Sequence, residues 1–168
     1  MDAGQVTIRR MGADEVEAFR RIRLEALRAD PSFFASSLED WEALPDDEWK
    51  RRLAEPVFVA FLDGEPVGVM GLQRQRPSKM AHRAMVIMVY VRKNLRGTGL
   101  AKSLLDVVAG YAGDAGILQL ELTASARNPA AIRFYEREGF TEMGRIPAGF
   151  LHDGEEIDDV LMVRRLIP

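Results

Sequence analysis

The stretch Arg96–Ser103 reads RGTGLAKS and places two glycines between an apolar run and a helical pattern. A glycine loop at the start of a helix offers unpaired backbone N–H groups and the positive end of the helix dipole, and both favour a bound anion. Gly97 and Gly99 would let the backbone approach a ligand closely. The stretch therefore raises the question of whether it binds a phosphate group, and in which compound.

Neither of two common nucleotide-binding loops fits this stretch fully. A triphosphate loop of the type G-x-x-x-x-G-K-[ST] needs glycine at positions 96 and 101, where this chain has Arg96 and Ala101. A dinucleotide loop of the type G-x-G-x-x-G needs glycine at position 102, where the chain has Lys102. The loop alone leaves two interpretations open: a pyrophosphate site, favoured by the basic residues around it, or a tight turn without a ligand.

The sequence around the loop predicts a mixed α/β sheet. Residues 83–91 (RAMVIMVYV) form a near-continuous apolar run, which is typical of a central strand buried on both faces. A helical pattern begins at Leu100, and residues 117–124 (ILQLELTA) alternate as a strand does. This strand–helix–strand unit is a crossover, so its two strands should run parallel. The other expected elements are strands at 6–9, 57–62, 67–75, about 140–146 and about 157–166, and helices at 14–29, about 46–54 and from Asn128 to Gly139.

Composition excludes several classes of protein. The 168 residues suit one domain, and 47% hydrophobic with 29% charged residues predicts a packed core. The chain has no cysteine and two histidines, which excludes thiolate catalysis and makes a metal site an unfavoured expectation. A net charge of −3 gives no bulk attraction to nucleic acid. Because no apolar run approaches the roughly 20 residues of a membrane span, we expect a cytoplasmic protein without a membrane partner.

Two segments together resemble the GNAT superfamily of N-acetyltransferases. Arg96, Gly99 and Ala101 occupy the fixed positions of its acetyl-CoA motif, [QR]-x-x-G-x-[GA]. The segment NPAAIRFYEREGF (128–140) matches its pattern N-x-x-A-x-x-x-Y-x-x-x-G-F. The order of the expected elements also fits, so the resemblance covers nearly the whole chain. It departs at Lys93, where many relatives have proline, a position that only shapes the approach to the loop.

The resemblance implies an α/β fold with a single N-acetyltransferase domain over residues 1–168. In the GNAT (acyl-CoA N-acyltransferase) fold, a mixed central sheet of about seven strands is flanked by about four helices. The two central parallel strands splay apart and leave a V-shaped gap for the pantetheine arm of CoA. The resemblance further implies acetyl-CoA as co-substrate without a metal, and a homodimer formed by paired sheets.

Roles for individual residues also follow from the resemblance. Tyr135 would be the catalytic residue that protonates the departing thiolate of CoA, and Asn128 would face the pantetheine arm. The loop amides would hold the CoA pyrophosphate, while the backbone of the central strand would pair with the arm. The expected CoA-binding residues are Val89, Tyr90, Val91, Arg96, Gly97, Thr98, Gly99, Leu100, Ala101, Lys102 and Asn128.

The general base stays open. Acetyl transfer needs a neutral amine, and an α-amine with a pKa of about 7.7 needs less help from a base than a lysine amine near about 10.4. The predicted central strand has no carboxylate, and Glu121 on the next strand should point away from the face of its leucine neighbours. A backbone N–H of Val89 or Val91 would stabilise the oxyanion. Acidic residues that could line the acceptor side are Glu25, Glu39, Asp40 and Glu42.

Plainer interpretations remain for several residues. Tyr135 could only pack within its helix, Asn128 could act as a helix cap alone, and Arg96 and Lys102 could be solvated. Trp41 and Phe34 could belong either to the core or to an acceptor site. At the level of function, the sequence predicts direct acetyl transfer to a primary amine of a small molecule or peptide. The alternatives are transfer from another acyl-CoA, a CoA-binding sensor without turnover, and a nucleotide-binding protein.

Overall fold

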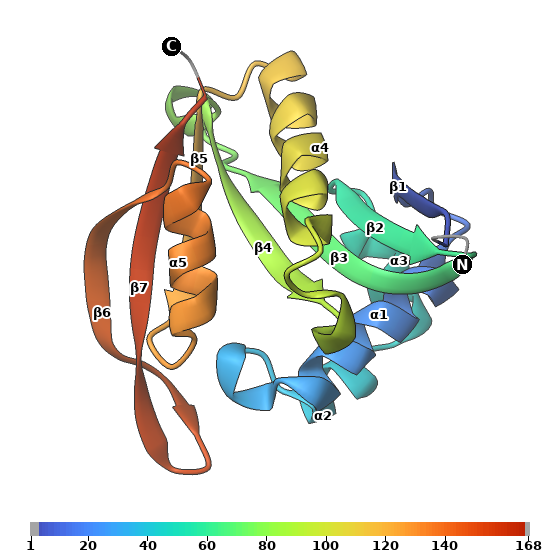
Figure 1. Cartoon of the computed structure of the whole chain (residues 1–168), viewed down its shortest axis with the longest axis horizontal. Coiled ribbons are helices and arrows are strands. Elements are labelled where there is room, and N and C mark those ends of the chain that lie inside the picture. The colour runs from blue at the N-terminus through green and yellow to red at the C-terminus, as the bar shows by residue number, and fades with distance from the viewer. Residues whose placement is uncertain (1–3, 167–168) are drawn as a thin grey trace.

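The computed structural model describes residues 4–166, which form one mixed sheet covered by helices on both faces (Figure 1). Within these residues the sheet has seven strands in the order β1-β2-β3-β4-β5-β7-β6. The strands are β1 (Val6–Arg10), β2 (Val57–Leu62), β3 (Glu65–Arg74), β4 (Arg83–Val91), β5 (Gln119–Ser125), β6 (Thr141–His152) and β7 (Glu155–Arg165). The α-helices are α1 (Val16–Ala29), α2 (Leu38–Glu42), α3 (Asp46–Arg52), α4 (Leu100–Asp114) and α5 (Pro129–Arg137). Short 3-10 turns are η1 (Pro31–Phe33), η2 (Ser78–Met80) and η3 (Lys93–Leu95).

The expected α/β fold is confirmed, and so is the parallel crossover. Strand β4 has the predicted bounds and pairs with β5 in parallel, while every other neighbouring pair of strands is antiparallel. Helix α5 begins as predicted, because the Asn128 side chain accepts a hydrogen bond from the Ala131 N–H at 3.2 Å and Pro129 is the first helical residue. Gly139, with φ of 93°, ends it.

One helix in the described chain was not expected. The prediction has about four helices and leaves residues 31–45 without a regular element, whereas the structure contains the short turn η1 and the helix α2 there. The Ser37 hydroxyl accepts a hydrogen bond from the Asp40 N–H and so caps α2. A helix of five residues shows too few turns for its periodicity to be read from sequence.

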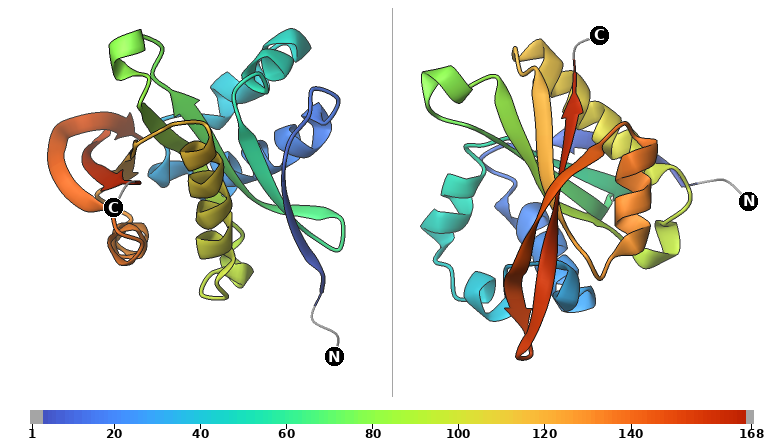
Figure 2. Two further views of the ribbon diagram at one scale, coloured as in Figure 1. Left: turned by 90° about the horizontal axis from the view of Figure 1, so that it is seen from above. Right: turned by 90° about the vertical axis from the view of Figure 1, so that its left-hand side faces the viewer.

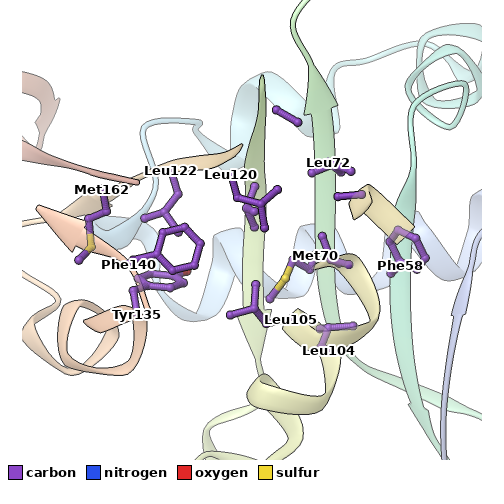
Figure 3. Packing of buried hydrophobic residues seen from close by; sticks show 14 of the residues in the cluster. Phe58, Met70, Leu72, Leu104, Leu105, Leu120, Leu122, Tyr135, Phe140 and Met162 are labelled. Carbon is purple, nitrogen blue, oxygen red and sulfur yellow. The ribbon is translucent and has the colours of Figure 1, made fainter. Parts of the chain in front are cut away.

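The sheet separates two layers of core. On one face α4 and α5 cover a cluster that includes Leu104, Leu105 and Tyr135, and Figure 3 shows part of it. On the other face α1, α2 and α3 cover a cluster that includes Phe19 and Trp49. Figure 2 shows these two groups of helices on opposite sides of the sheet. The sheet is therefore buried on both sides wherever helices cover it.

Strand β4 leaves β5 soon after the two strands pair. The parallel pairing runs only from Arg83–Met85 to Gln119–Glu121, and beyond it the strands diverge (Figure 1). This divergence is the predicted V-shaped splay, and it corrects one detail of the prediction. Strand β4 is central but is not buried on both faces throughout, because its middle residues, 87–89, are half-buried along the gap.

A bulge bends β4 at the splay. Val69 of β3 pairs with Tyr90 and Gly71 pairs with Ile87, so the single residue between them on β3 faces two residues on β4. One of those two, Met88, has a left-handed φ of 57°, which is uncommon for a residue with a side chain. A Cβ added at Gly71 would lie 2.6 Å from the Met88 Cε, so the glycine makes room for this bulge. The bulge leaves a β4 backbone group outside the ladder with β3.

No helix within residues 4–166 combines the length and the apolar character needed to cross a membrane.

Candidate functional site

A cleft of about 600 Å³ occupies the gap between β4 and β5. On the α4–α5 face it is lined by residues of the glycine loop and of α5, including Gly97, Ala101, Asn128 and Tyr135. On the α1–α2 face it is lined by Arg23, Phe34 and Trp41, and hairpin β6–β7 adds Phe150 and Asp159. The cleft therefore passes from one face of the sheet to the other, and two compounds entering from opposite faces would meet in it.

The glycine loop has the geometry of an anion site. Gly97 and Gly99 have φ of 80° and 91°, a conformation that residues with a side chain rarely adopt. A Cβ added at either glycine would meet no atom within 4 Å, so the space above the loop is open. The Ser103 N–H donates to the Gly99 carbonyl oxygen at 3.0 Å, and the N–H groups of residues 100–102 precede this bond. The loop thus fits a pyrophosphate held by backbone amides.

The predicted CoA-binding residues fall into two groups. Seven of them line the cleft: Val89, Tyr90, Val91, Arg96, Gly97, Ala101 and Asn128. Gly99 lies within the loop itself. Leu100 is the first residue of α4 and is buried in the core, and the Thr98 hydroxyl donates to the Leu95 carbonyl oxygen at 2.5 Å. The Lys102 ammonium lies 3.1 Å from Asp106 and 3.5 Å from Glu138, so it is an ion-paired helix residue.

Arg96 ties the loop to the rest of the site. Its guanidinium donates to the Val91 carbonyl oxygen at 2.8 Å and to the Asp30 carboxylate at 2.5 Å. It also lies over the Tyr90 ring, 5.8 Å from its centre. Arg96 is therefore neither a freely solvated charge nor fully committed to a ligand, and it joins the end of α1 to the end of β4.

Tyr135 lines the cleft from α5. Its ring packs against Phe134 and Phe140 with centroid distances of 5.3 and 5.6 Å, and its side chain is nearly fully buried. Burial raises the pKa of Tyr135 above the ordinary 10.0 of tyrosine. Among the described residues its hydroxyl has no hydrogen-bond partner, although the side chain borders the cleft. The hydroxyl is thus neutral at physiological pH and available as a donor.

The carboxylates expected near the acceptor lie elsewhere. Glu121 forms a bidentate pair with Arg83, at 2.5 and 2.7 Å, where β4 and β5 still pair. Glu25 accepts hydrogen bonds from Arg92 at 2.7 and 2.9 Å and from the Tyr90 hydroxyl at 3.0 Å. Glu39, Asp40 and Glu42 are also outside the cleft lining. None of these five candidates is placed to act as a base in the cleft.

We expect Glu25→Gln to reduce the free energy of unfolding by about 1 kcal/mol at pH 7, since it removes the charge from a network that solvent partly screens. Burial raises the Glu25 pKa, but the hydrogen bonds from Arg92 and Tyr90 outweigh burial and lower it overall. Its stabilisation is therefore present above the ordinary value of 4.5 and is lost as pH falls through the lowered pKa. Denaturant unfolding of both proteins from pH 7 to about pH 3 measures the difference; one that does not shrink at acid pH would contradict this assignment.

Of the charged residues that line the cleft, sequence reasoning assigned only Arg96 to the site; it missed Arg23, Asp30, Arg52, Arg137 and Asp159. Arg23 lies in α1 on the same stripe as Phe19, Ile22 and Leu27, so an arginine at a core-facing helical position was the available signal. Asp159 lies in β7, where it pairs with Ile146 of β6. A Cβ added at Gly149 of β6 would lie 2.6 Å from its carboxylate, so the glycine makes room for it. Strand alternation alone could not tell Asp159 from a solvated residue.

Comparison with known proteins agrees with this fold. Residues 18–140 match the Acetyltransferase (GNAT) family. The chain is 26% identical to the L-amino acid N-acetyltransferase AaaT of Escherichia coli over 95% of this chain and 98% of that protein. It is 27% identical to an uncharacterized N-acetyltransferase of Methanocaldococcus jannaschii over 81% of this chain. The chain spans 61% of the length of that archaeal relative and 52% of another curated relative.

A solved structure shows the same fold. The acetyltransferase yncA of Salmonella typhimurium, solved with its cofactor acetyl-CoA, superimposes with a TM-score of 0.80 over 98% of this chain and 95% of that one, at 21% identity. The family match covers most of the chain, and the splayed strands with their glycine loop lie inside it. The chain belongs to the acetyltransferase (GNAT) family.

Proposed function

We propose that this protein is an N-acetyltransferase that moves the acetyl group of acetyl-CoA directly to a primary amine. The observation that carries the proposal is the cleft between β4 and β5, which joins an open glycine loop on one face of the sheet to an aromatic and charged chamber on the other. A thioester entering along the loop and an amine entering from the opposite face would meet beside β4. Direct transfer also suits a chain without cysteine.

Acetyl-CoA would be held by backbone more than by side chains. The N–H groups of residues 97–102 would bind its pyrophosphate, and the β4 backbone at Val89 and Val91 would pair with its pantetheine arm, as a strand adds to an open edge. Asn128 uses its side-chain oxygen as the α5 cap, so its amide N–H₂ remains to donate toward the cleft. When bound, acetyl-CoA supplies the activated acetyl thioester.

Asp159 is the carboxylate that we assign to the amine. Within residues 4–166, two carboxylates line the cleft, and one of them, Asp30, is paired with Arg96. Asp159 has no ion-pair or hydrogen-bond partner for its side chain among residues 4–166, and burial raises its pKa above the ordinary 3.8. A carboxylate of raised basicity can bind an ammonium group and accept its proton.

Tyr135 is the acid that we assign to the leaving thiolate. A phenol with a pKa near 10 that donates to a thiolate near 8.5 is unfavourable by roughly 2 kcal/mol, and the raised pKa of Tyr135 increases this cost. The step remains feasible if later proton loss to solvent draws it forward. A backbone N–H at the β4 bulge would stabilise the developing oxyanion. The chain thus supplies a base, an acid and an oxyanion donor from β7, α5 and β4.

The direct test is a screen of amine acceptors with acetyl-CoA that measures the release of free thiol. L-Amino acids are the first acceptors to include, because a relative that aligns over nearly its whole length is named an L-amino acid N-acetyltransferase. Propionyl-CoA and succinyl-CoA test the choice of acyl group. CoA binding without turnover of any amine would overturn the enzymatic proposal and favour a sensor.

We expect Asp159→Asn to lower kcat/KM by about 100-fold, the usual range for loss of a general base. In the wild type, kcat/KM rises with pH as the amine loses its proton, and it falls more steeply below the raised pKa of Asp159, where both groups are protonated. The variant should keep only the slope set by the amine. Because a half-buried carboxylate with a raised pKa destabilises the fold near neutral pH, the variant should melt no lower than the wild type. An unchanged pH profile would rule out this role.

We also propose a homodimer. Strand β6 is an edge strand of the described sheet, and it exposes Met143, Ile146 and Leu151. Exposed apolar side chains on a sheet edge favour association with another chain.

A further inference from the structure

Arg23 is a buried charge that has no ionic partner among the residues that the structure describes. Its side chain projects from α1 into the cleft and is only 3% exposed. Within the described part of the chain, its Nε and Nη1 atoms have no hydrogen-bond partner. A buried guanidinium normally finds a carboxylate or carbonyl oxygen, since leaving its donors unpaired costs free energy. Arg23 therefore needs a partner that residues 4–166 do not supply.

The aromatic and basic neighbours of Arg23 offer no hydrogen-bond acceptor for its guanidinium. Its guanidinium carbon lies 4.3 Å from the centre of the Trp41 ring and 5.3 Å from that of Phe34. The Arg52 guanidinium lies 4.2 Å from the centre of the same Trp41 ring and also lines the cleft. Aromatic faces stabilise a cation but accept no strong hydrogen bond from its N–H groups. Burial and the Arg52 charge lower the pKa of Arg23 to about 9, so the pair gathers positive charge in an aromatic chamber.

The position of Arg23 identifies the ligand that it would meet. Arg23 and Trp41 belong to the α1–α2 side of the sheet, whereas the glycine loop continues into α4 on the other side (Figure 2). The acetyl donor would occupy the loop side, so the acceptor would occupy the side of Arg23. Asp159, the carboxylate assigned to the amine, lines the same cleft.

We propose that Arg23, with Arg52 beside it, binds an anionic oxygen group carried by the acceptor amine. This inference rests on the proposed function, and it narrows the substrate class to amines that carry a carboxylate or a phosphonate. The planar guanidinium fork of Arg23 matches either group through paired N–H···O bonds. Asp159 and Arg23 would then hold opposite charges of one zwitterion, and the rings of Trp41 and Phe34 would exclude water from the arginine end.

The test compares acceptors that differ in this one group. The wild-type protein is assayed with L-amino acids, their α-carboxamides and the matching aminoalkylphosphonic acids. We expect kcat/KM for the acids to exceed that for the amides by about 100-fold, in line with charged hydrogen bonds formed in a buried site. The phosphonates then show whether the site accepts a tetrahedral anion as well as a planar one.

Arg23→Met should remove this preference. We expect kcat/KM for acids to fall by about 100-fold, mainly through KM, while kcat/KM for amides changes by less than about threefold. Arg21→Met is the matched control, because Arg21 lies on the same helix with a side chain 61% exposed and does not line the cleft. Since methionine replaces an unpaired buried charge, Arg23→Met should melt no lower than the wild type, and Arg23→Lys should recover part of the preference. Arg52→Met should also lower kcat/KM for acids, by a smaller factor than Arg23→Met does.

Specific outcomes would overturn the assignment. Equal losses on acids and amides in Arg23→Met would give Arg23 a structural role, and a wild-type preference for amides would exclude an anion site. A loss of CoA affinity in Arg23→Met would assign the anion to CoA itself. If no amine is turned over, the proposed function fails, but the anion site can still be tested. Calorimetry on the CoA-bound protein then compares the binding of acids with that of amides. If acids bind more tightly than amides and this difference disappears in Arg23→Met, the anion site is supported. Equal binding of acids and amides by the wild type would contradict it.

Discussion

Gly99→Glu should weaken CoA binding by at least about 1,000-fold, the largest effect that we expect from a single substitution. The N–H groups that follow Gly99 would form charge-assisted hydrogen bonds to the pyrophosphate, and each such bond is stronger than a neutral one. With φ of 91° and no atom within 4 Å of its added Cβ, residue 99 would direct a carboxylate into the open space above the loop. That carboxylate would both fill the pyrophosphate position and repel its charge. Calorimetric titration with CoA measures the effect.

The strain of a side chain at positive φ must be separated from the loss of the ligand. Such strain costs about 1–2 kcal/mol and reduces stability, not specifically affinity. Gly64→Glu is a matched control, because Gly64 has φ of 84° and is equally open, but belongs to the β2–β3 turn, which does not line the cleft. We expect the two variants to lose similar stability and only Gly99→Glu to lose CoA. Ser103→Ala should bind CoA normally, which a triphosphate loop would not allow. Normal CoA binding by Gly99→Glu would refute the loop as the pyrophosphate site.

The fold could be predicted from the sequence largely because its signals are local. Strand β4 is bounded by a polar loop and a glycine loop, so its predicted and observed ends coincide. Asn128, Pro129 and Gly139 define the two ends of α5 for similar reasons. The bulge at Met88 was not predictable, because left-handed backbone at a methionine has no sequence signature and depends on the space left by Gly71 across the sheet. The short helix α2 was missed because it has barely more than one turn.

The candidate site was likewise predictable only where its residues are close together in the sequence. The loop and Tyr135 lie in contiguous motifs, and the structure places them on one side of one cleft. The acceptor side is assembled from α1, η1, α2 and the β6–β7 hairpin, which are far apart in the sequence. Its charges could not be assigned from sequence, because pairing decides which of them is available: Glu25 is occupied by Arg92, whereas Asp159 and Arg23 lack ionic partners among residues 4–166. Only the three-dimensional structure shows which charged side chains are already ion-paired and which are available to a ligand.

Tyr135→Phe should lower kcat by about 100- to 1,000-fold while CoA binds with nearly unchanged affinity, since loss of a general acid commonly costs about 10²–10⁴ in rate. Phenylalanine keeps the packing against Phe134 and Phe140 and removes only the hydroxyl, which has no partner among the described residues. Stability should therefore hold or rise, because an unpaired hydroxyl leaves a buried site. Single-turnover thiol release and CoA titration measure the rate and the affinity separately.

The dependence of kcat on pH above pH 7 is a second test of Tyr135 as the acid. Because burial raises the pKa of Tyr135 above 10.0, its hydroxyl keeps its proton as pH rises, and wild-type kcat should not fall between pH 7 and about 10 through loss of this acid. Tyr111→Phe is the matched control: the Tyr111 hydroxyl accepts a hydrogen bond from Arg10 at 3.2 Å and lies outside the cleft lining, so its removal should leave kcat unchanged. Wild-type rates in Tyr135→Phe would reduce Tyr135 to a packing residue. The proton of the leaving thiol would then have to come from solvent, through the cleft mouth on the α4–α5 face.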